Sequence, residues 1–304
     1  MIKRLLIFLF FCFIFPAAVF AQIRYTVIPD SPLPGDPVTI GVNVPIKEAL
    51  LLVNGRQVAK ANGFFVPAAD GQPGFTAAIL SVPSTVEAES AIIRLNSESG
   101  VLAEIPIRVT PREFRSGTIN LNPSLTSLVA DPNPQRTAES ERLWAILNTT
   151  GNQIYHTGTF VLPVTSTRRT SQFGARRVNV YSDGRRVTSI HAGIDFGVPT
   201  GTEVFASGRG RVVLSRMRIL TGYSIIIEHA PGVYSLYYHL DRVIAQEGAI
   251  VETGALIGLS GSTGFSTGPH LHWEVRVSSE NTDPDVFVSR PLIDKDLIIS
   301  RIFN

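Results

Sequence analysis

The stretch HLHWEVRV at residues 270–277 alternates in side-chain character and follows a Gly-Pro pair. Successive side chains of a β-strand point to opposite faces, so residues two apart share one face. A strand here would place His270 and His272 together, with Leu271 packed on the other side. Their Cα atoms would be about 7 Å apart, close enough for both imidazoles to serve one site. The stretch predicts a strand that carries a histidine pair, which alone is a weak signal for a metal.

Around this strand, the C-terminal part of the chain repeats short apolar runs separated by glycines. Such runs between turn residues are typical of β-strands joined by tight turns. The predicted strands cover residues 211–214, 224–228, 234–238, 256–259 and 270–277. The sequence therefore predicts a glycine-turned antiparallel β-sheet domain over residues 160–304.

The N-terminal part also reads as β structure. Apolar or alternating runs at residues 38–42, 49–53, 75–82, 91–95 and 105–109 are separated by Asn-Gly, Asp-Gly and Pro-Gly turn signals. Strands at this spacing predict a small Ig-like β-sandwich over residues 22–115. This part contains no histidine and no cluster of candidate catalytic residues.

Residues 116–159 are predicted to link the two parts. A breaker at residues 131–134 precedes a helical pattern from Thr137 to Leu147, with Thr137 and Ser140 as candidate caps. Leu143, Ile146 and Leu147 would form its apolar face. The chain as a whole is thus expected to be all-β, with one short linker helix that lies on one of the two domains.

The first 21 residues have the pattern of a secretory signal peptide. Lys3 and Arg4 precede an apolar run over residues 5–15, and small residues lie before Gln22. The run is too short to span a bilayer comfortably, so we expect export without stable membrane insertion, with a retained N-terminal anchor as the alternative. Removing residues 1–21 leaves 25 basic and 25 acidic residues and no cysteine. This balance gives no reason to expect a nucleic-acid partner.

Histidines gather in the C-terminal part in a way that suggests a metal site. Five of the six histidines lie between residues 191 and 272. His191 and Asp195 would be about 13 Å apart in an extended chain, so the chain must bend between them, and Gly193 permits a bend. His191, Asp195 and His272 then make a three-ligand set. Three protein ligands with one open position are typical of catalytic zinc, whereas four indicate a structural ion.

Several motifs together resemble one enzyme family. The runs at residues 171–176, 191–196, 237–240, 261–264 and 268–274 are similar, in order and spacing, to the lysostaphin/LytM-type zinc endopeptidases over about residues 160–290. The resemblance implies that His191, Asp195 and His272 ligate one Zn²⁺ per chain. It implies that His239 and His270 flank the scissile carbonyl, as general base and transition-state stabiliser, and that the substrate is peptidoglycan. An exported hydrolase of this kind would act in the periplasm or outside the cell.

Several other functions compete with this one. A non-catalytic regulator of other wall hydrolases would be expected to have lost metal ligands, and none is lost here. An autoinhibited enzyme remains an alternative, in which the N-terminal domain or linker contacts the cleft. A lipoyl-type carrier needs an exposed lysine, but no lysine lies between Lys60 and Lys295. His/His/Asp sites also accept divalent ions other than zinc.

Two further features are open to two interpretations each, and two histidines are expected to lie outside the site. Glu274 shares the predicted strand face of His272 and is either a partner of an imidazole or a solvated residue, the second being favoured. Arginine pairs at residues 168–169, 176–177 and 185–186 either bind an anionic substrate or, as favoured here, lie solvated in loops. His229 is expected to be structural, and His156 solvated.

Overall fold

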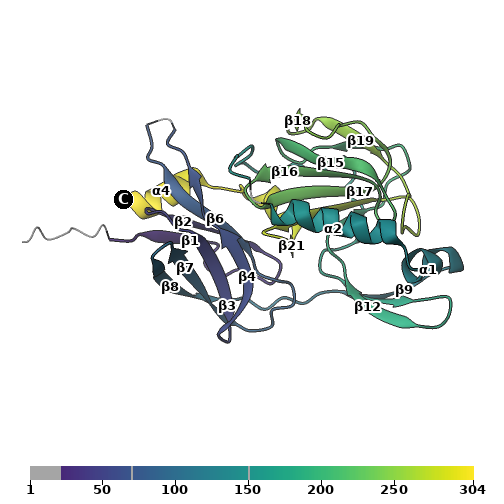
Figure 1. Cartoon of the computed structure of the whole chain (residues 1–304), viewed down its shortest axis with the longest axis horizontal. Helices are drawn as coiled ribbons and strands as arrows, with labels where there is room; N and C mark the ends of the chain where they lie inside the picture. Colours follow the sequence, from purple (N-terminus) through teal and green to yellow (C-terminus); the bar gives the residue numbers. More distant parts are fainter. Residues whose placement is uncertain (1–21, 70, 150) are drawn as a thin grey trace, which may run out of the picture.

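The computed structural model describes residues 22–69, 71–149 and 151–304, and the predicted signal peptide lies outside them. Two β-rich halves lie next to one another along the long axis (Figure 1). Strands dominate both halves, so the predicted all-β class is confirmed. Within the described residues, no helix is long and apolar enough to cross a membrane.

The N-terminal half is a sandwich of two four-stranded antiparallel sheets. The predicted strands are confirmed, and three further strands extend the sheets. In spatial order, one sheet holds β1 (Tyr25–Ile28), β2 (Pro37–Val42), β6 (Phe75–Ser81) and β5 (Phe64–Val66). The other holds β4 (Arg56–Asn62), β3 (Glu48–Val53), β7 (Ser90–Ser97) and β8 (Gly100–Arg108). Alternate side chains from both sheets, including Ile40, Leu51 and Ile93, form the buried core between them.

The C-terminal helix α4 (Lys295–Phe303) packs against β1 and β2 of this sandwich. Ile298 and Ile302 are fully buried, and Ile298 fills the space that a side chain at Gly41 would need. The Thr39 hydroxyl donates a hydrogen bond to the Leu292 carbonyl, in the segment that leads into the helix. The end of the chain therefore belongs structurally with its beginning.

The C-terminal half is built on one large antiparallel sheet. Its main path runs β10 (Arg169–Ser171), β13 (Ile194–Phe196), β20 (Leu271–Val277), β17 (Val233–Val243), β16 (Gly222–Ala230), β15 (Gly210–Arg218) and β18 (Ile250–Val251). Off this path lie β14 (Glu203–Phe205), β19 (Leu256–Ser260) and β21 (Glu280–Thr282), followed by the short helix α3 (Pro284–Ser289). The predicted strands of this half are confirmed. Most of their ends agree with the structure within two residues.

Helix α2 (Pro134–Asn148) covers one face of the large sheet. Leu143, Ile146 and Leu147 pack on β15, β16 and β17, as the predicted apolar face required. The helix begins earlier than predicted. Its cap is Asn133, whose side chain accepts a hydrogen bond from the Arg136 amide. Pro134 follows at the first helical position, which suits proline because no hydrogen bond is needed from its nitrogen there.

A small three-stranded sheet stands beside the large one, in the order β12 (Arg186–Ile190), β11 (Arg176–Val180) and β9 (Ser116–Asn120). The β11–β12 hairpin is antiparallel, whereas β9 joins β11 in parallel. The segment between the halves therefore adds a strand to the C-terminal half, and helix α1 (Pro123–Ala130) follows it. The sequence did not predict this pairing.

Candidate metal centre

The three predicted ligands meet although they come from different parts of the chain. His191 follows β12, Asp195 lies in β13 and His272 in β20. Antiparallel pairing sets Asp195 directly opposite His272. Each of the three residues offers one ligand atom, and these atoms all lie within 4.8 Å of one another. All three side chains are buried.

The ligand atoms are identified by their short mutual distances. His191 Nε2 lies 3.1 Å from Asp195 Oδ1 and 3.0 Å from His272 Nδ1. His272 Nδ1 lies 2.7 Å from Asp195 Oδ1. Two imidazole nitrogens and one carboxylate oxygen are a donor set that suits zinc and related divalent ions.

Gly193 serves this geometry because it has no side chain. Its backbone does not have a positive φ. Instead, a Cβ at this position would lie 2.2 Å from the Trp273 carbonyl oxygen. Glycine is needed because the chain between His191 and Asp195 passes directly against β20.

His239 and His270 approach the same point from two other segments. The His239 ring lies 4.8 Å from the His270 ring and 6.1 Å from the His272 ring, measured between centroids. His270 Nε2 lies 3.7 Å from Asp195 Oδ1. His270 precedes β20 in an isolated bridge to Gly261, so the histidine pair is split between a bridge and a strand.

A bulge in β17 directs His239 to the site. Tyr223 pairs with Leu240 and Ile225 with Tyr237, so β17 has one more residue than β16 between these pairs. His239 has a φ of +60°, which is unusual for a residue other than glycine. The extra residue breaks the alternation of faces, and both Tyr238 and His239 can contact His272.

In each of the four histidines of the cluster, the ring nitrogen that faces away from the centre is bound to an acceptor. His191 Nδ1 lies 2.8 Å from the Gln172 carbonyl, His239 Nδ1 2.8 Å from the Thr263 carbonyl, and His270 Nδ1 2.8 Å from the Gly268 carbonyl. Since a carbonyl can only accept, each of these nitrogens carries the proton. The Nε2 lone pair of each ring is then left for the centre of the site.

For His272 the outer partner is Glu274, and the favoured prediction for that residue was wrong. Glu274 is buried, and its Oε1 lies 3.0 Å from His272 Nε2. Arg276 donates to its other oxygen at 2.9 Å. A carboxylate behind a ligating imidazole orients the ring and raises its basicity. The alternation of β20 explains the contact, because residues 272, 274 and 276 share a face.

The electrostatics of the cluster favour a cation. Burial alone would lower the pKa of His272, but hydrogen bonds to Asp195 and Glu274, together with their charges, raise it to about 9. Burial would raise the pKa of Asp195, but hydrogen bonds from His191 and His272 keep it well below its usual range. A proton is therefore stabilised where a divalent ion would bind, and an ion that replaced it would release that proton.

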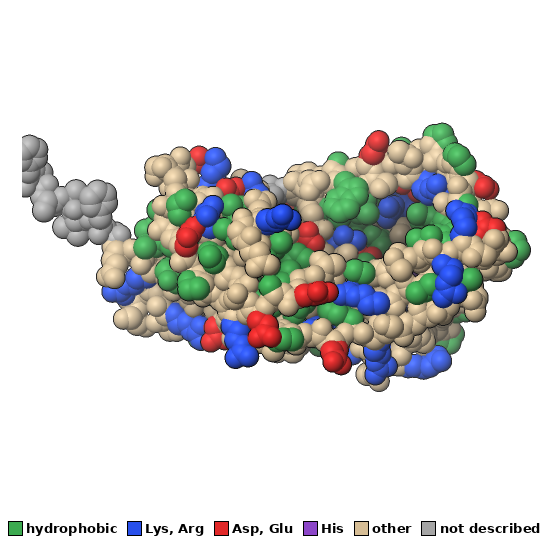
Figure 2. Space-filling view, turned by 90° about the horizontal axis from the view of Figure 1, so that it is seen from below, with side chains coloured by type: hydrophobic (Ala, Val, Ile, Leu, Met, Phe, Trp, Pro, Cys, Tyr) green, Lys and Arg blue, Asp and Glu red, His purple; other side chains and the backbone are tan. Residues whose placement is uncertain are grey.

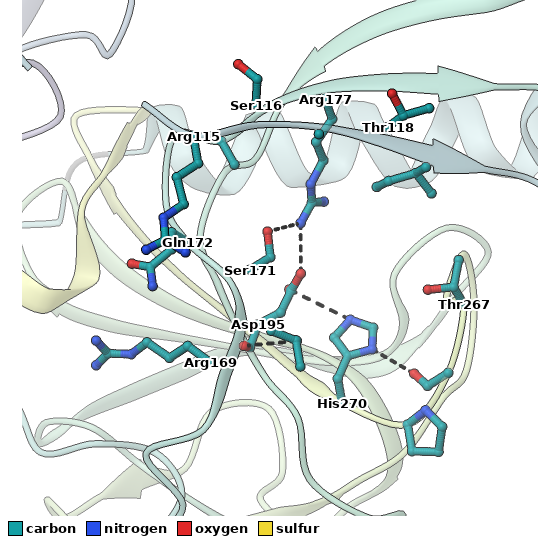
Figure 3. A pocket seen from close by; sticks show the side chains of 16 residues that line it. Arg115, Ser116, Thr118, Arg169, Ser171, Gln172, Arg177, Asp195, Thr267 and His270 are labelled. Atoms are coloured by element: carbon teal, nitrogen blue, oxygen red, sulfur yellow. Dashed lines mark hydrogen bonds and ion pairs between the residues drawn. The ribbon is translucent and has the colours of Figure 1, made fainter. Parts of the chain in front are cut away.

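The sequence did not predict the contact between Arg177 and Asp195. It lies in β11, where its guanidinium donates to Asp195 Oδ2 at 2.8 Å and to the Ser171 hydroxyl at 2.7 Å (Figure 3). This leaves Asp195 Oδ1 as the oxygen that faces the histidines. The prediction of solvated arginine pairs is therefore wrong for Arg177, and for Arg169, which forms a bidentate pair with Asp285.

A cavity of about 460 Å³ opens beside Asp195 and His270. One wall is the loop at residues 267–269, and another is the segment of residues 115–119 that includes most of β9. Figure 3 shows this segment crossing the cavity on the side of Arg177. The remaining histidines are structural: His229 is buried outside the cluster, and His156 is half-buried against Phe160 and not solvated as predicted.

Known proteins match this part of the chain. Residues 189–284 match the family described as Peptidase family M23. DD-carboxypeptidase/endopeptidase Mpg of Neisseria meningitidis is 40% identical over 122 residues, which cover 40% of this chain and 27% of that protein. Peptidoglycan DD-endopeptidase ShyA of Vibrio cholerae is 41% identical over 110 residues, which cover 36% and 25%. The matched stretch thus spans about a quarter of these relatives.

Solved structures extend the comparison. A Pseudomonas aeruginosa protein classed as an M23 peptidase is 20% identical, covers 84% of this chain and 94% of its own, and has a TM-score of 0.58, which shows a shared fold. The catalytic domain of the M23 protein EnpA from Enterococcus faecalis is 32% identical over 41% of this chain and 95% of its own, with a TM-score of 0.35. Residues 189–284, which hold the His191, Asp195 and His272 cluster, thus match peptidase family M23.

Proposed function

We propose that this chain is an exported zinc metalloendopeptidase that hydrolyses peptide cross-links of peptidoglycan during wall remodelling. The observation that carries the proposal is the convergence of one atom each from His191, Asp195 and His272 within 4.8 Å. Three ligands would hold one Zn²⁺ and leave a position open for reactants. The named activities of the relatives support the choice of substrate, and the apolar run at residues 5–15 supports export to the periplasm or beyond.

When bound, the metal ion would supply Lewis acidity for the scissile carbonyl and for the attacking water. The chain's own residues would handle the protons. Burial, together with the charges of nearby His272 and His270, lowers the pKa of His239 to about 3, so its ring is neutral at pH 7. Because Nδ1–H is held by the Thr263 carbonyl, Nε2 is the atom that would accept a proton.

His239 and His270 would divide two tasks. One takes the proton from water and returns it to the leaving amine, and the other, when its Nε2 is protonated as well as its Nδ1, donates a hydrogen bond to the developing oxyanion. Such a donor contributes about 3 kcal/mol to transition-state stabilisation when it is positioned in advance. Both rings are fixed through Nδ1, to the Thr263 and Gly268 carbonyls, so little reorganisation is needed.

One observation favours the alternative of an autoinhibited or non-catalytic LytM-like regulator of other wall hydrolases. Residues 115–119 line the cavity beside Asp195, so a segment outside residues 160–304 contributes to its wall. In this alternative, the segment would have to leave before a peptide could bind. We favour the enzyme, because all five predicted site residues point to one centre.

The test is cleavage of purified peptidoglycan by the zinc-loaded chain from residue 22 onward. The readouts are new amino groups and the identity of the released peptides. Cleavage that is lost with a chelator and in His272→Ala would support an endopeptidase and name the bond. An intact polymer, despite one zinc per folded chain, would favour the regulator.

A further inference from the structure

The cavity beside the metal centre has an unusual charge distribution. Among the residues that line it, three are arginines, at positions 115, 169 and 177, and only Asp195 is acidic. Arg169 is neutralised by its bidentate pair with Asp285, at 2.7 and 2.9 Å. Two cationic side chains therefore remain to act on the contents of the cavity.

Arg177 has hydrogen-bonding capacity that its known contacts do not use. One of its terminal nitrogens makes both the contact to Asp195 and the contact to Ser171. Among the described residues, no hydrogen-bond partner is found for its other terminal nitrogen or for Nε. The side chain keeps 22% of its surface exposed, on a strand that borders the cavity. It can thus hold Asp195 and donate to a second anion.

Arg115 supplies the second charge from the neighbouring segment. Its carbonyl accepts a hydrogen bond from the Arg176 amide, and Phe114 packs against Gly174, so the backbone at this point is fixed on the hairpin. No ionic partner of its side chain lies among the described residues. In Figure 3, both side chains extend down from the upper wall of the cavity: Arg177 ends above Asp195, and Arg115 ends beside Gln172, with Ser171 between them.

We propose that Arg115 and Arg177 bind a free carboxylate of the substrate next to the scissile amide. Guanidinium groups match carboxylates in geometry and form strong, charge-assisted hydrogen bonds with them. Arg177 donates to Asp195 Oδ2, on the side of the carboxylate that faces away from the histidines. A carboxylate bound to Arg177 would therefore lie within a few atoms of the reacting carbonyl. An α-carboxylate on the carbon that bears the amide nitrogen has this placement.

The proposal rests on the proposed function and narrows its substrate. The chain would select cross-links in which the amine side is an α-amino acid with an unblocked carboxylate, or a carboxyl-terminal residue. It would cleave cross-bridges of glycine less efficiently. In these, the carbon that bears the amide nitrogen is followed by another amide and not by a free carboxylate. Figure 2 shows Lys and Arg side chains around a hollow in the half that holds the large sheet, in keeping with an anionic substrate.

The experiment compares two dimeric muropeptides that differ only in the carboxylate beside the cross-link, which is either free or amidated. For the zinc-loaded chain, kcat/KM should be about 10- to 100-fold higher for the free acid. Arg115→Gln and Arg177→Gln should each reduce this ratio at least about threefold. Arg186→Gln, which removes a charge from the same hairpin outside the cavity, should leave it unchanged. Zinc content is measured in each variant, because Arg177 also contacts Asp195.

A ratio near one in the wild type, or a ratio that persists in both cavity variants, would overturn the carboxylate site. Binding of both dimers to zinc-loaded His239→Ala is measured by calorimetry and should give the same preference. This separates the two proposals: if no dimer is cleaved but the acid still binds more tightly, the carboxylate site stands and the peptidase proposal fails.

Discussion

His272 and His229 are both buried on the large sheet, yet only His272 belongs to the metal-binding cluster. His229 has both nitrogens bound, to the Arg209 carbonyl at 2.9 Å and to the Ser235 hydroxyl at 2.7 Å. His272 has one nitrogen bound to Glu274, while the other faces Asp195 and His191. A histidine becomes a candidate ligand when one nitrogen is held and the other converges with further donors, and burial alone does not decide it.

The two surroundings also act on the proton in opposite directions. Burial lowers the pKa of His229 to about 3, with the nearby His156 adding to the effect against the Arg209 hydrogen bond. Carboxylates raise the pKa of His272 to about 9 despite its burial. One site excludes positive charge and the other attracts it.

The largest effect is expected from removing a nitrogen that faces the centre. His272→Ala should lose zinc and reduce cleavage by more than about a hundredfold, since even residues behind metal ligands are worth 10- to 100-fold. His229→Gln, at a comparable depth, should keep one zinc per folded chain. Metal analysis and peptidoglycan cleavage on both variants check this, and zinc retained in His272→Ala would refute the assignment.

A smaller effect is expected from the carboxylate behind the ligand. Glu274→Gln keeps the shape but weakens the support of His272, so zinc affinity should fall about 10- to 100-fold. Competition with a chromophoric chelator measures the affinity directly. Glu280→Gln, on the neighbouring strand β21, serves as the control, and equal affinities in the two variants would mean that Glu274 is only structural.

Loss of the other histidine should affect stability and not chemistry. His229→Ala leaves the Ser235 hydroxyl without one partner and removes a ring that packs against Phe160 at 4.7 Å. The free energy of unfolding should decrease by about 1–3 kcal/mol. Denaturant unfolding measures this loss, and a folded variant with unaltered stability would contradict the structural role.

The smallest effect is a pH dependence. His229 is neutral in the folded chain down to about pH 3, whereas in the unfolded chain it binds a proton below about pH 6.5. The unfolded state then holds more protons, so the stability that His229 contributes is complete above pH 6.5 and decreases as the pH falls towards 3. Between pH 6.5 and 5.5 the loss should be about 1 kcal/mol.

This pH effect is isolated by subtracting the same curve for His229→Gln. Titration of the metal centre is common to both chains and cancels in the difference. Two parallel curves would show that His229 is protonated in the folded state, against its burial and its hydrogen bonds.

Much of this molecule could be predicted from local patterns, because strands appear as short apolar or alternating runs and the turns between them contain glycine. The strands at residues 38–42 and 234–238 and the packing face of α2 are examples. The grouping of His191, Asp195 and His272 was also predicted, and zinc binding by them stays a prediction.

What the sequence did not reveal depends on partners far along the chain. The bulge at His239 exists only in relation to β16, and β9 joins a strand about 60 residues away. Arg177 looked like any other exposed arginine until β11 placed it beside Asp195. That Glu274 shares a strand face with His272 could be predicted from the alternation of side chains along the strand. That this face is buried could not.

Helix α4 has a consequence for the order in which the protein can fold. A ribosome makes β1 and β2 long before residues 295–303, yet the apolar surface of those strands is covered by Ile298 and Ile302. Contacts between residues so distant in the chain form slowly. Until α4 has been made, the sheet that holds β1 and β2 presents an uncovered apolar face that promotes aggregation. A chain truncated before Ile298 would therefore be destabilised at β1 and β2, far away in the sequence.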